Sequence, residues 1–334
     1  MTKASVLFAA LLSGGVQFIS PSSARAEDWP TRPVTMVVPF VAGGAFDILA
    51  RVLAPRISEV LGRQIVIENV AGAGGVIAAV RVAKAPPDGY QFVLGDSSFA
   101  HSQALYKNPP YNTAADFAPV ALIAEQPAVL IARNALPITN ISEFIEYAKK
   151  NESTMRYGSA GPGSPTHLAC LLLNLAIGVN ITHVPYRGGA PAMQDVIAER
   201  LDYQYPILGT AVSQIEGKQV KAIAILTKNR SPRLPMLTAA HEQGLVNFEA
   251  SAWNAFFLPR GTPAAVIRKL HDATVAAMET PAVQARLKEL GVSMVTPERR
   301  SPEYLKEFVA AEIEKWTGLI KTAGIAVESS SPPN

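Results

Sequence analysis

The order of local patterns along the chain constrains the fold more than any other feature of the sequence. A buried strand predicted over residues 34–40 is followed by a glycine-rich turn and by apolar residues at helical spacing over 47–61. The same order recurs with a strand over 64–69, a second glycine-rich turn, a helix that ends near residue 85 and a strand over 90–95. This alternation predicts parallel strands with helices on both faces of the sheet.

The second half of the chain repeats the pattern. Residues 119–133 predict two strands, or one long strand interrupted at Pro127. A strand over 155–158 then precedes a Gly/Ser/Pro turn and a helix from Thr166. A further strand over 252–258 could return to the first half of the chain. Since the sequence has 334 residues, it is long enough for two domains.

These patterns predict an α/β fold of two lobes, each a mainly parallel sheet flanked by helices, joined by crossing strands. We expect lobe 1 to comprise residues 27–124 and 251–334, and lobe 2 to comprise residues 125–250. In open α/β sheets ligands bind beyond the carboxyl ends of the strands. A binding site is therefore expected between the lobes, at the turns that follow the strands.

Residues 1–26 have the pattern of a signal peptide. Lys3 gives a short positive start, residues 4–12 are apolar, and Ala24-Arg25-Ala26 is a small-x-small cleavage signal. The apolar stretch is too short for a membrane anchor, because a spanning helix needs about 20 residues. We expect export to the periplasm with cleavage near Ala26. Removal of Lys3 and Arg25 leaves 28 basic and 27 acidic residues, so the net charge falls from +3 to +1.

Two glycine-rich turns have the composition of anion-binding sites. Ala42-Gly43-Gly44 precedes Asp47 at the start of the first helix, and residues 159–166 precede a helix of the second half. A helix N-terminus offers unpaired backbone N–H groups and the positive end of the helix dipole. Each turn alone could be a simple strand-to-helix connection. Two such turns in equivalent places favour a ligand with a carboxylate at each end.

Charge and cysteine content argue against several other kinds of site. A net charge of +3 without a basic stripe does not indicate a nucleic-acid partner. A single cysteine, Cys170, excludes an intrachain disulfide and multi-cysteine zinc or iron–sulfur sites. The five histidines lack the spacing of zinc ligands. We therefore expect neither a metal nor a cofactor.

The motifs that would indicate an enzyme each fail at one position. The turn at Gly72-Ala73-Gly74-Gly75 has Ile77 where a dinucleotide-binding motif needs Gly or Ala. Tyr157 stands where a nucleophile elbow around Ser159 needs glycine. His167, beside the second turn, could donate a hydrogen bond to a ligand or simply pack at a helix start. No motif supports catalysis.

Short motifs distributed over the whole mature chain match one known family. The motifs are Trp29 to Val34, Val38-Pro39-Phe40, Ala42-Gly43-Gly44 with Asp47, Ala50-Arg51, Glu68-Asn69, Gly72 to Gly75, Ala83-Lys84-Ala85, Pro87 to Tyr90, Asp116 to Val120, His183 to Gly188, Lys221 to Ala224 and Arg230 to Pro235. In their residues and in their order they resemble the Bug family, the periplasmic solute receptors of tripartite tricarboxylate transporters.

The resemblance implies a two-lobed periplasmic binding protein, type II-like, that closes on a small carboxylate by a hinge motion. It further implies delivery to integral-membrane permease subunits. In the family, the first turn and the matching turn of the second lobe hold the ligand, largely through backbone donors and water. The implied ligand-binding residues here are Phe40, Ala42, Gly43, Gly44, Asp47, Ser97, Ser98, Ser159, Ala160, Gly163, Thr166, His167 and Tyr205.

One segment departs from the family pattern. Many members have an Asp-Asn pair after the segment that corresponds to Leu201-Asp202, whereas this chain reads Tyr203-Gln204-Tyr205. The departure removes an acidic group that could meet a ligand ammonium, which argues against an amino-acid ligand. Tyr205 could stack on an aromatic ligand, pack along an aliphatic diacid, or belong to the core.

Residues and resemblance together predict a receptor for a small carboxylate, in particular an aliphatic or aromatic dicarboxylate, without catalytic activity. We expect it to act as a monomer with a transporter permease as its partner. Two alternatives remain. The protein could report ligand occupancy to a membrane sensor kinase, or it could be an exported enzyme on the same scaffold, because fold alone does not fix function.

Overall fold

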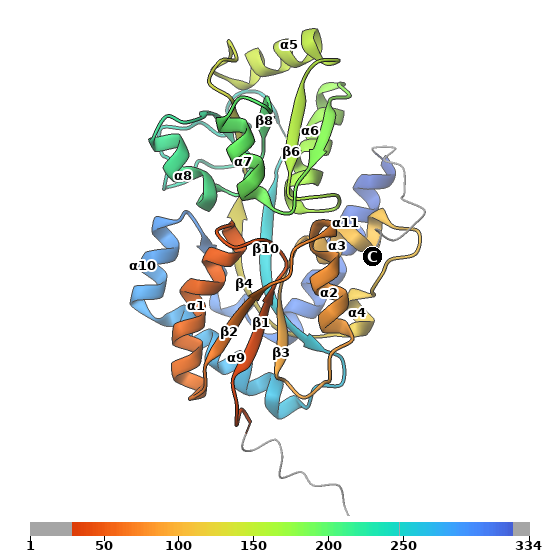
Figure 1. Cartoon of the computed structure of the whole chain (residues 1–334), viewed down its shortest axis with the longest axis vertical. Helices are drawn as coiled ribbons and strands as arrows, with labels where there is room; N and C mark the ends of the chain where they lie inside the picture. Colours follow the sequence, from red (N-terminus) through yellow and green to blue (C-terminus); the bar gives the residue numbers. More distant parts are fainter. Residues whose placement is uncertain (1–28, 247, 323–334) are drawn as a thin grey trace, which may run out of the picture.

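The computed structural model describes residues 29–246 and 248–322. The predicted signal peptide, residues 1–26, lies outside the described residues. Within the described part of the chain, no helix is both long enough and apolar enough to cross a membrane. Figure 1 shows two groups of elements stacked along the long axis, with β4 and β10 running between them.

The lower group in Figure 1 is built on a six-stranded sheet with the order β11-β4-β10-β3-β1-β2. Its strands are β1 (Val34–Val38), β2 (Ile65–Asn69), β3 (Gln91–Asp96), β4 (Phe117–Pro127), β10 (Ser251–Pro259) and β11 (Ser293–Met294). Strand β1 pairs in parallel with β2 and β3, while β10 pairs antiparallel with β3 and β4. We call the part of the chain around this sheet lobe 1.

The upper group is built on a five-stranded sheet with the order β7-β6-β8-β5-β9. Its strands are β5 (Val129–Ala132), β6 (Arg156–Ser159), β7 (Thr182–Pro185), β8 (Tyr203–Gln204) and β9 (Lys221–Ile225). Strand β6 pairs in parallel with β7 and β8, while β5 pairs antiparallel with β8 and β9. We call the part of the chain around this sheet lobe 2.

The α/β architecture of two sheets with flanking helices is confirmed, but the expectation of mainly parallel sheets is wrong. Each sheet contains one parallel unit of three strands, β2-β1-β3 or β7-β6-β8, joined to antiparallel strands. The cause is the chain crossing between lobes, because β10 re-enters the first sheet in the direction opposite to β3. Strand β4 extends past the proposed boundary at residues 124/125, and the lobe boundaries stay a prediction.

Helices cover both faces of each sheet. In lobe 1, α1 packs against α9 and α10, whereas α3 packs against α11. These and the remaining helices are α1 (Ala45–Leu61), η2 (Ala73–Gly75), α2 (Val76–Ala83), α3 (Ser98–Leu105), α4 (Thr113–Asp116), α9 (Ala264–Glu279), α10 (Pro281–Glu289), η3 (Pro297–Arg299) and α11 (Pro302–Thr322). Lobe 2 contributes α5 (Ile141–Asn151), α6 (Pro165–Ile177), α7 (Gly189–Ile197) and α8 (Leu208–Glu216).

The buried apolar residues form one core in lobe 1 and two cores on the faces of the lobe 2 sheet. The lobe 1 core also includes three residues from lobe 2, namely Ala160, Leu168 and Ile207. Apolar packing is therefore continuous across the boundary between the lobes. Because α1 and α6 follow β1 and β6, the middle strands of the two parallel units, both helix N-termini lie at the carboxyl edges of their sheets.

Candidate ligand-binding site between the two sheets

The turn after β1 is held in shape by the carboxylate of Asp47. Its Oδ2 accepts hydrogen bonds from the backbone N–H of Gly43 and from Arg51 Nε, both at 2.9 Å. Its Oδ1 accepts from Asn69 Nδ2 at 3.0 Å, and the same amide donates to the carbonyl of Phe40 at 2.9 Å. One buried side chain thus ties the turn to its own helix and to β2.

Asp47 is 2% exposed, so its negative charge depends on these donors. Burial alone would raise the pKa of Asp47, but the hydrogen bonds from Arg51, Gly43 and Asn69 outweigh burial and lower it. Gly44, the residue before α1, has no side chain to cap the helix. The first N–H groups of α1 are therefore left for a ligand or solvent.

Hydroxyl groups hold the turn after β6. Ser159 Oγ lies 2.6 Å from His183 Nε2 and accepts a hydrogen bond from the N–H of Gly161 at 3.1 Å. The N–H of Ala160 donates to Thr166 Oγ1 at 2.9 Å. Ser159, Ala160 and Thr166 are all buried. The side-chain oxygens of Ser159 and Thr166 are thus engaged within lobe 2, while Pro162 of the turn contacts lobe 1.

The N-terminus of α6 is capped from within. Ser164 Oγ accepts a hydrogen bond from the N–H of His167, and the N–H of Gly163 donates to His167 Nδ1, both at 3.2 Å. The rings of His167 and His183 stack with centroids 4.2 Å apart. Burial lowers the pKa of His167 to about 3 and that of His183 to about 4. At neutral pH, therefore, neither ring carries a positive charge.

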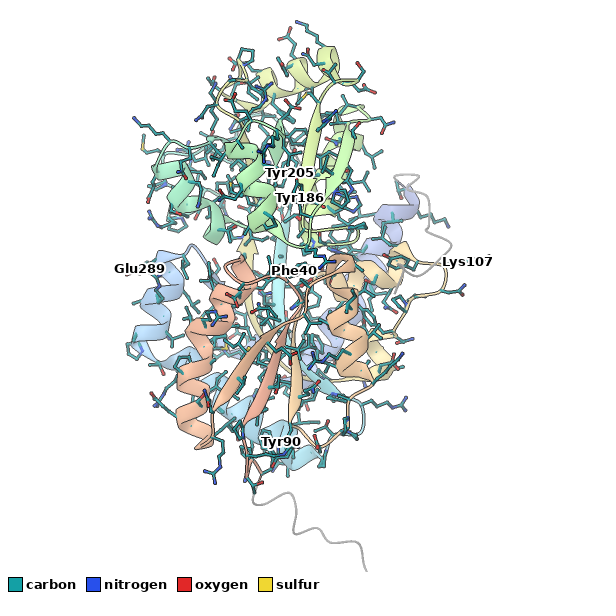
Figure 2. The ribbon with its side chains drawn as sticks, in the orientation of Figure 1. Phe40, Tyr90, Lys107, Tyr186, Tyr205 and Glu289 are labelled. Carbon is teal, nitrogen blue, oxygen red and sulfur yellow. The ribbon has the colours of Figure 1, made fainter. Side chains whose placement is uncertain are left out.

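The two lobes touch directly at glycines on both sides. A Cβ atom on Gly74 would collide with the carbonyl oxygen of Pro162. A Cβ atom on Gly188 would stand 2.7 Å from Val41 Cγ2. The lobes are therefore in direct contact at two separate points. Figure 2 shows Phe40 at the edge of lobe 1 that faces lobe 2.

A small cavity of about 10 Å³ lies between residues of the two lobes. Its lining includes His101, Thr166, Tyr205 and Trp316. His101 Nδ1 lies 3.2 Å from the carbonyl of Gly163, and its ring meets that of Trp316 edge-on. Tyr205 is fully buried in the lobe 2 core, with its hydroxyl unpaired within the described chain. The cavity has room for about one water molecule, so Tyr205 does not face a ligand-sized space.

Ser97 and Ser98 follow β3 and occupy different environments. Ser97 Oγ accepts a hydrogen bond from the N–H of Trp253 at 3.0 Å, which ties β3 to β10. Ser98 Oγ is buried and without a partner among the described residues, and it lies 3.2 Å from where a Cβ on Gly75 would be. Ser98 is thus the serine with a free hydroxyl beside the turns.

Sequence patterns missed four buried polar residues at the facing edges of the sheets, namely Asp96, Gln126, Gln204 and Asn254. Each is at most 1% exposed and has one side-chain atom without a hydrogen-bond partner in the described chain. Asn254 could have been noticed as the single amide in the apolar run 252–258. Asp96 could have been noticed because it ends the strand predicted over 90–95 and precedes two serines.

No group of three His, Cys, Asp or Glu side chains in the described residues could hold a metal ion. The arrangement therefore offers backbone donors, hydroxyls, amides and neutral imidazoles. Such groups can bind and orient a small polar molecule. The turns after β1 and β6 both adjoin the turn after β2, with Ser98 beside Gly75 of that turn and Tyr205 set back in the core.

Three solved structures are similar to this chain over nearly its whole length. The periplasmic binding protein BugD has a TM-score of 0.86 and 40% identity, covering 90% of this chain and 100% of its own. MatC from Rhodopseudomonas palustris, with bound malate, has a TM-score of 0.85 and 38% identity, covering 87% and 100%. Another R. palustris protein, with adipate, has a TM-score of 0.84 and 37% identity, covering 89% and 99%.

A family model also matches the sequence. The model TctC, described as the tripartite tricarboxylate transporter family receptor, matches residues 49–325. The match spans both lobes and includes most of α1, both crossing strands and the turn after β6. The chain therefore belongs to the TctC family of tripartite tricarboxylate transporter receptors, as the resemblance to the Bug proteins predicted.

Proposed function

We propose that the protein captures a small dicarboxylate between its two lobes and holds it at the turns after β1 and β6. The observation that carries the proposal is the pair of glycine-rich turns, which lie at helix N-termini where the lobes are in contact and both adjoin the turn after β2. At the turn after β1 a carboxylate can accept N–H groups that α1 leaves free. At the turn after β6, where side chains already accept from most of the N–H groups, the helix dipole favours a carboxylate. Malate and adipate, bound in two similar proteins, are both dicarboxylates.

A ligand that touches both turns favours the closed arrangement, because it gains the second set of contacts only when the lobes meet. The neutral state of His167 and His183 supports this proposal, since neither ring has to lose a proton when the lobes close. Ligand anions are then held by dipoles and hydrogen bonds rather than by a buried cation.

We further propose that the protein works in the periplasm after removal of residues 1–26, as a monomer that delivers its ligand to permease subunits of a tripartite transporter. The family supports the transport role. A receptor for a membrane sensor kinase would bind the same ligands, so pull-down with the permease subunits distinguishes the two. Failure of the ligand-loaded protein to bind the permease would contradict delivery.

One contact favours the alternative of an enzyme, namely the 2.6 Å approach of Ser159 Oγ to His183 Nε2. In a serine nucleophile the histidine takes the hydroxyl proton, and a third group orients the ring. Here the ring of His183 is stacked between Tyr157 and His167, and Ser159 is fully buried. The pair therefore fits a structural hydrogen bond better than an exposed nucleophile.

A thermal-shift panel of mono-, di- and tricarboxylates tests the proposal. A dicarboxylate at about 100 times its Kd should stabilise the folded protein by about 2.7 kcal/mol. Calorimetry should then give saturable binding with one ligand per chain, and the ligand should be recovered unchanged. If no carboxylate raises the Tm, dicarboxylate capture is wrong; if the ligand is converted, the enzyme alternative gains support.

A further inference from the structure

Three of the missed polar residues form a row at the carboxyl edge of the lobe 1 sheet. Asp96 on β3 stands directly opposite Asn254 on β10 in their antiparallel pair. On the far side of Asn254, Gln126 on β4 donates from Nε2 to Asn254 Oδ1 at 2.6 Å. Extending the parallel register of β1 and β3 places Phe40 level with Asp96, so the row begins beside the turn after β1.

Asp96 is a buried carboxyl group without a cation. Its Oδ1 accepts a hydrogen bond from the N–H of Ser98 at 2.7 Å, which caps the start of α3. Within the described chain its Oδ2 has no well-formed hydrogen bond and no Lys, Arg or His forms an ion pair with it; the neighbouring Ser98 hydroxyl is the one side-chain donor that lowers its pKa. A buried, unpaired carboxylate is costly, so this oxygen favours a donor from elsewhere.

The amide pair beside it leaves one acceptor and one donor unused. In the arrangement described, Gln126 Oε1 and Asn254 Nδ2 are the atoms without partners in the described chain. If both amides were turned around, one acceptor and one donor would again be unpaired. The number of unpaired groups therefore does not depend on which amide atom is assigned as O and which as N. The helix α8 begins next to this pair, since a Cβ on Gly209 would lie 3.8 Å from Gln126 Oε1.

Gln204 provides a further free acceptor from lobe 2. It ends β8, and its Nε2 donates to the carbonyl of Gly189 at 3.2 Å, at the start of α7. This bond fixes the amide with Oε1 as the free atom, because a turned amide would set two oxygens against each other. The preceding Gly188 packs against Val41, so Gln204 lies where lobe 2 meets the turn after β1.

The unpaired atoms of the row and of Gln204 are mostly acceptors. They are Asp96 Oδ2, Gln126 Oε1 and Gln204 Oε1, against the single donor Asn254 Nδ2. A plain dicarboxylate brings acceptors only, so its carboxylates satisfy the helix N-termini but not these oxygens. A ligand that also carries an O–H or N–H group satisfies them, and a ligand lacking that group leaves buried acceptors unpaired.

We propose that Asp96, with the amides of Gln126, Asn254 and Gln204, reads a hydrogen-bond donor, a hydroxyl or an ammonium, on the carbon chain of the dicarboxylate. This inference rests on the proposed function. It places an acidic recognition residue in lobe 1, whereas the segment at 203–206 of lobe 2 lacks one. The departure from the family pattern therefore does not exclude an amino-acid ligand.

Protonation of Asp96 separates the two kinds of donor. Burial raises the pKa of Asp96 to about 7, and the titratable side chain that faces it is the buried Tyr111, whose own pKa is raised. A ligand ammonium requires the carboxylate, so its affinity should rise with pH up to about 8. A hydroxyl can donate to the carboxylate or accept from the acid, so its affinity should change less.

Calorimetry with succinate, malate and aspartate tests the inference, because the three share a four-carbon diacid chain and differ in one substituent. The wild-type protein should bind malate or aspartate at least about tenfold tighter than succinate, which equals one well-formed polar contact of about 1.4 kcal/mol. In Asp96→Asn, which keeps an oxygen to cap α3, this ratio should fall to about threefold or less.

Asp88→Asn is the matched control, because Asp88 is an exposed acid. Its Oδ1 accepts a hydrogen bond from the N–H of Tyr90, which Figure 2 shows at the end of lobe 1 away from lobe 2. It should keep the wild-type ratio. If Asp96→Asn fails to fold, Gln204→Leu tests the same row from lobe 2 and should also lower the ratio.

Equal affinities for the three acids in the wild type, or an unchanged ratio in both Asp96→Asn and Gln204→Leu, would overturn the inference while leaving dicarboxylate capture intact. Binding of none of the three acids, together with no response in the wider carboxylate panel, would overturn the proposed function and the inference with it.

Discussion

The turns after β1 and β6 occupy equivalent places in the two sheets, but different chemistry holds them. In lobe 1 a charged side chain, Asp47, gathers three donors, including the guanidinium of Arg51. In lobe 2 neutral groups hold the turn. The hydroxyls of Thr166 and Ser159 accept hydrogen bonds from backbone N–H groups, and the imidazole of His167 accepts one from the N–H of Gly163. The comparison shows that turns in equivalent places can be held either by a buried charged group or by neutral groups alone.

The two lobes also differ in which parts touch. In lobe 2 the turn after β6, which would hold the ligand, also makes the contact with lobe 1, because Pro162 and Ser164 lie against Gly74. Lobe 1 offers a separate turn, the one after β2, for that contact. A change at Gly74 therefore disturbs closure without altering the side chains of the proposed anion site in either lobe.

The largest effect is expected from Gly74→Ala. The added Cβ would collide with the Pro162 carbonyl and stand 2.9 Å from the backbone N of Ser164, so the lobes could not meet as they do here. A ligand would then touch one turn only, and its affinity should fall at least about 100-fold, or about 2.7 kcal/mol. Calorimetry measures the affinity, and small-angle scattering should show that ligand no longer compacts the protein.

Gly62→Ala is the control for this variant. Gly62 also has a positive φ, 67° against 62° for Gly74, but a Cβ there would have no atom within 4 Å. Both variants carry the same kind of backbone strain, so only the collision differs. If Gly74→Ala binds as tightly as Gly62→Ala, the contact between Gly74 and lobe 2 is not needed for capture.

The next effect separates the charged turn from the neutral one. Asp47→Ala removes three hydrogen bonds to a charged group and should lower the free energy of unfolding by about 2–3 kcal/mol. Thr166→Val removes two neutral hydrogen bonds, one from the N–H of Ala160 and one with Ser164 Oγ, and should cost about 1–2 kcal/mol. Urea unfolding measures both. Equal losses would show that charge gives the lobe 1 turn no added stability.

The third effect is a dependence of the free energy of unfolding on pH, caused by the two buried histidines at the lobe 2 turn. The pKa values of His167 and His183, about 3 and 4, lie below the ordinary value of 6.5 because the rings are buried. Between pH 6.5 and 4 the unfolded chain therefore binds protons that the folded chain does not, and stability falls as the pH drops. The pKa of Asp47 is lowered from 3.8, so its contribution changes little between pH 7.5 and 5 and declines only as the pH approaches 3.8.

Urea unfolding at pH 7.5 and pH 5 checks this expectation. The loss of stability at pH 5 should be smaller in the double variant His167→Gln, His183→Asn than in the wild type. Asp96 acts in the opposite direction, because its raised pKa means that the folded chain holds the extra proton. His241→Gln, at an exposed histidine, should leave the loss unchanged. An undiminished loss in the double variant would assign acid sensitivity to other groups.

Local patterns were enough to predict the elements that carry the turns. The helix expected over 47–61 is α1, and the helix expected from Thr166 is α6, each after a predicted strand. Periodicity and glycine position are properties of neighbouring residues, so sequence reasoning can reach them. The direction of β10 was missed, because it depends on how the chain returns from lobe 2.

The row of amides illustrates why the rest of the site could not be predicted. Gln126 and Asn254 are bonded to each other but lie 128 positions apart in the sequence. Neither belongs to a motif, and each stands in a strand that reads as core. Asp47, in contrast, belongs to a recognisable turn, yet the sequence does not show that both its oxygens are used within lobe 1.

The smallest effect concerns charge outside both turns. Arg187 is exposed, has no ion pair within the described chain and adjoins Gly188, which contacts the lobe 1 turn. A cation there should draw dianions toward the site from a distance. Arg187→Gln should slow association a few-fold at low salt, and the difference should fade above about 0.15 M, where the Debye length is about 8 Å. Stopped-flow tryptophan fluorescence measures the rate.

Lys107→Gln makes the same change of charge at an exposed residue on the side of lobe 1, as Figure 2 shows, and should leave the rate nearly unchanged. Dissociation should hardly change in either variant, because the ligand is held at the turns and not by Arg187. If Arg187→Gln instead speeds dissociation, the arginine contacts the bound anion. Lobe 2 would then also contribute a charged side chain to the anion site, and the two lobes would no longer differ in using a charged and a neutral turn.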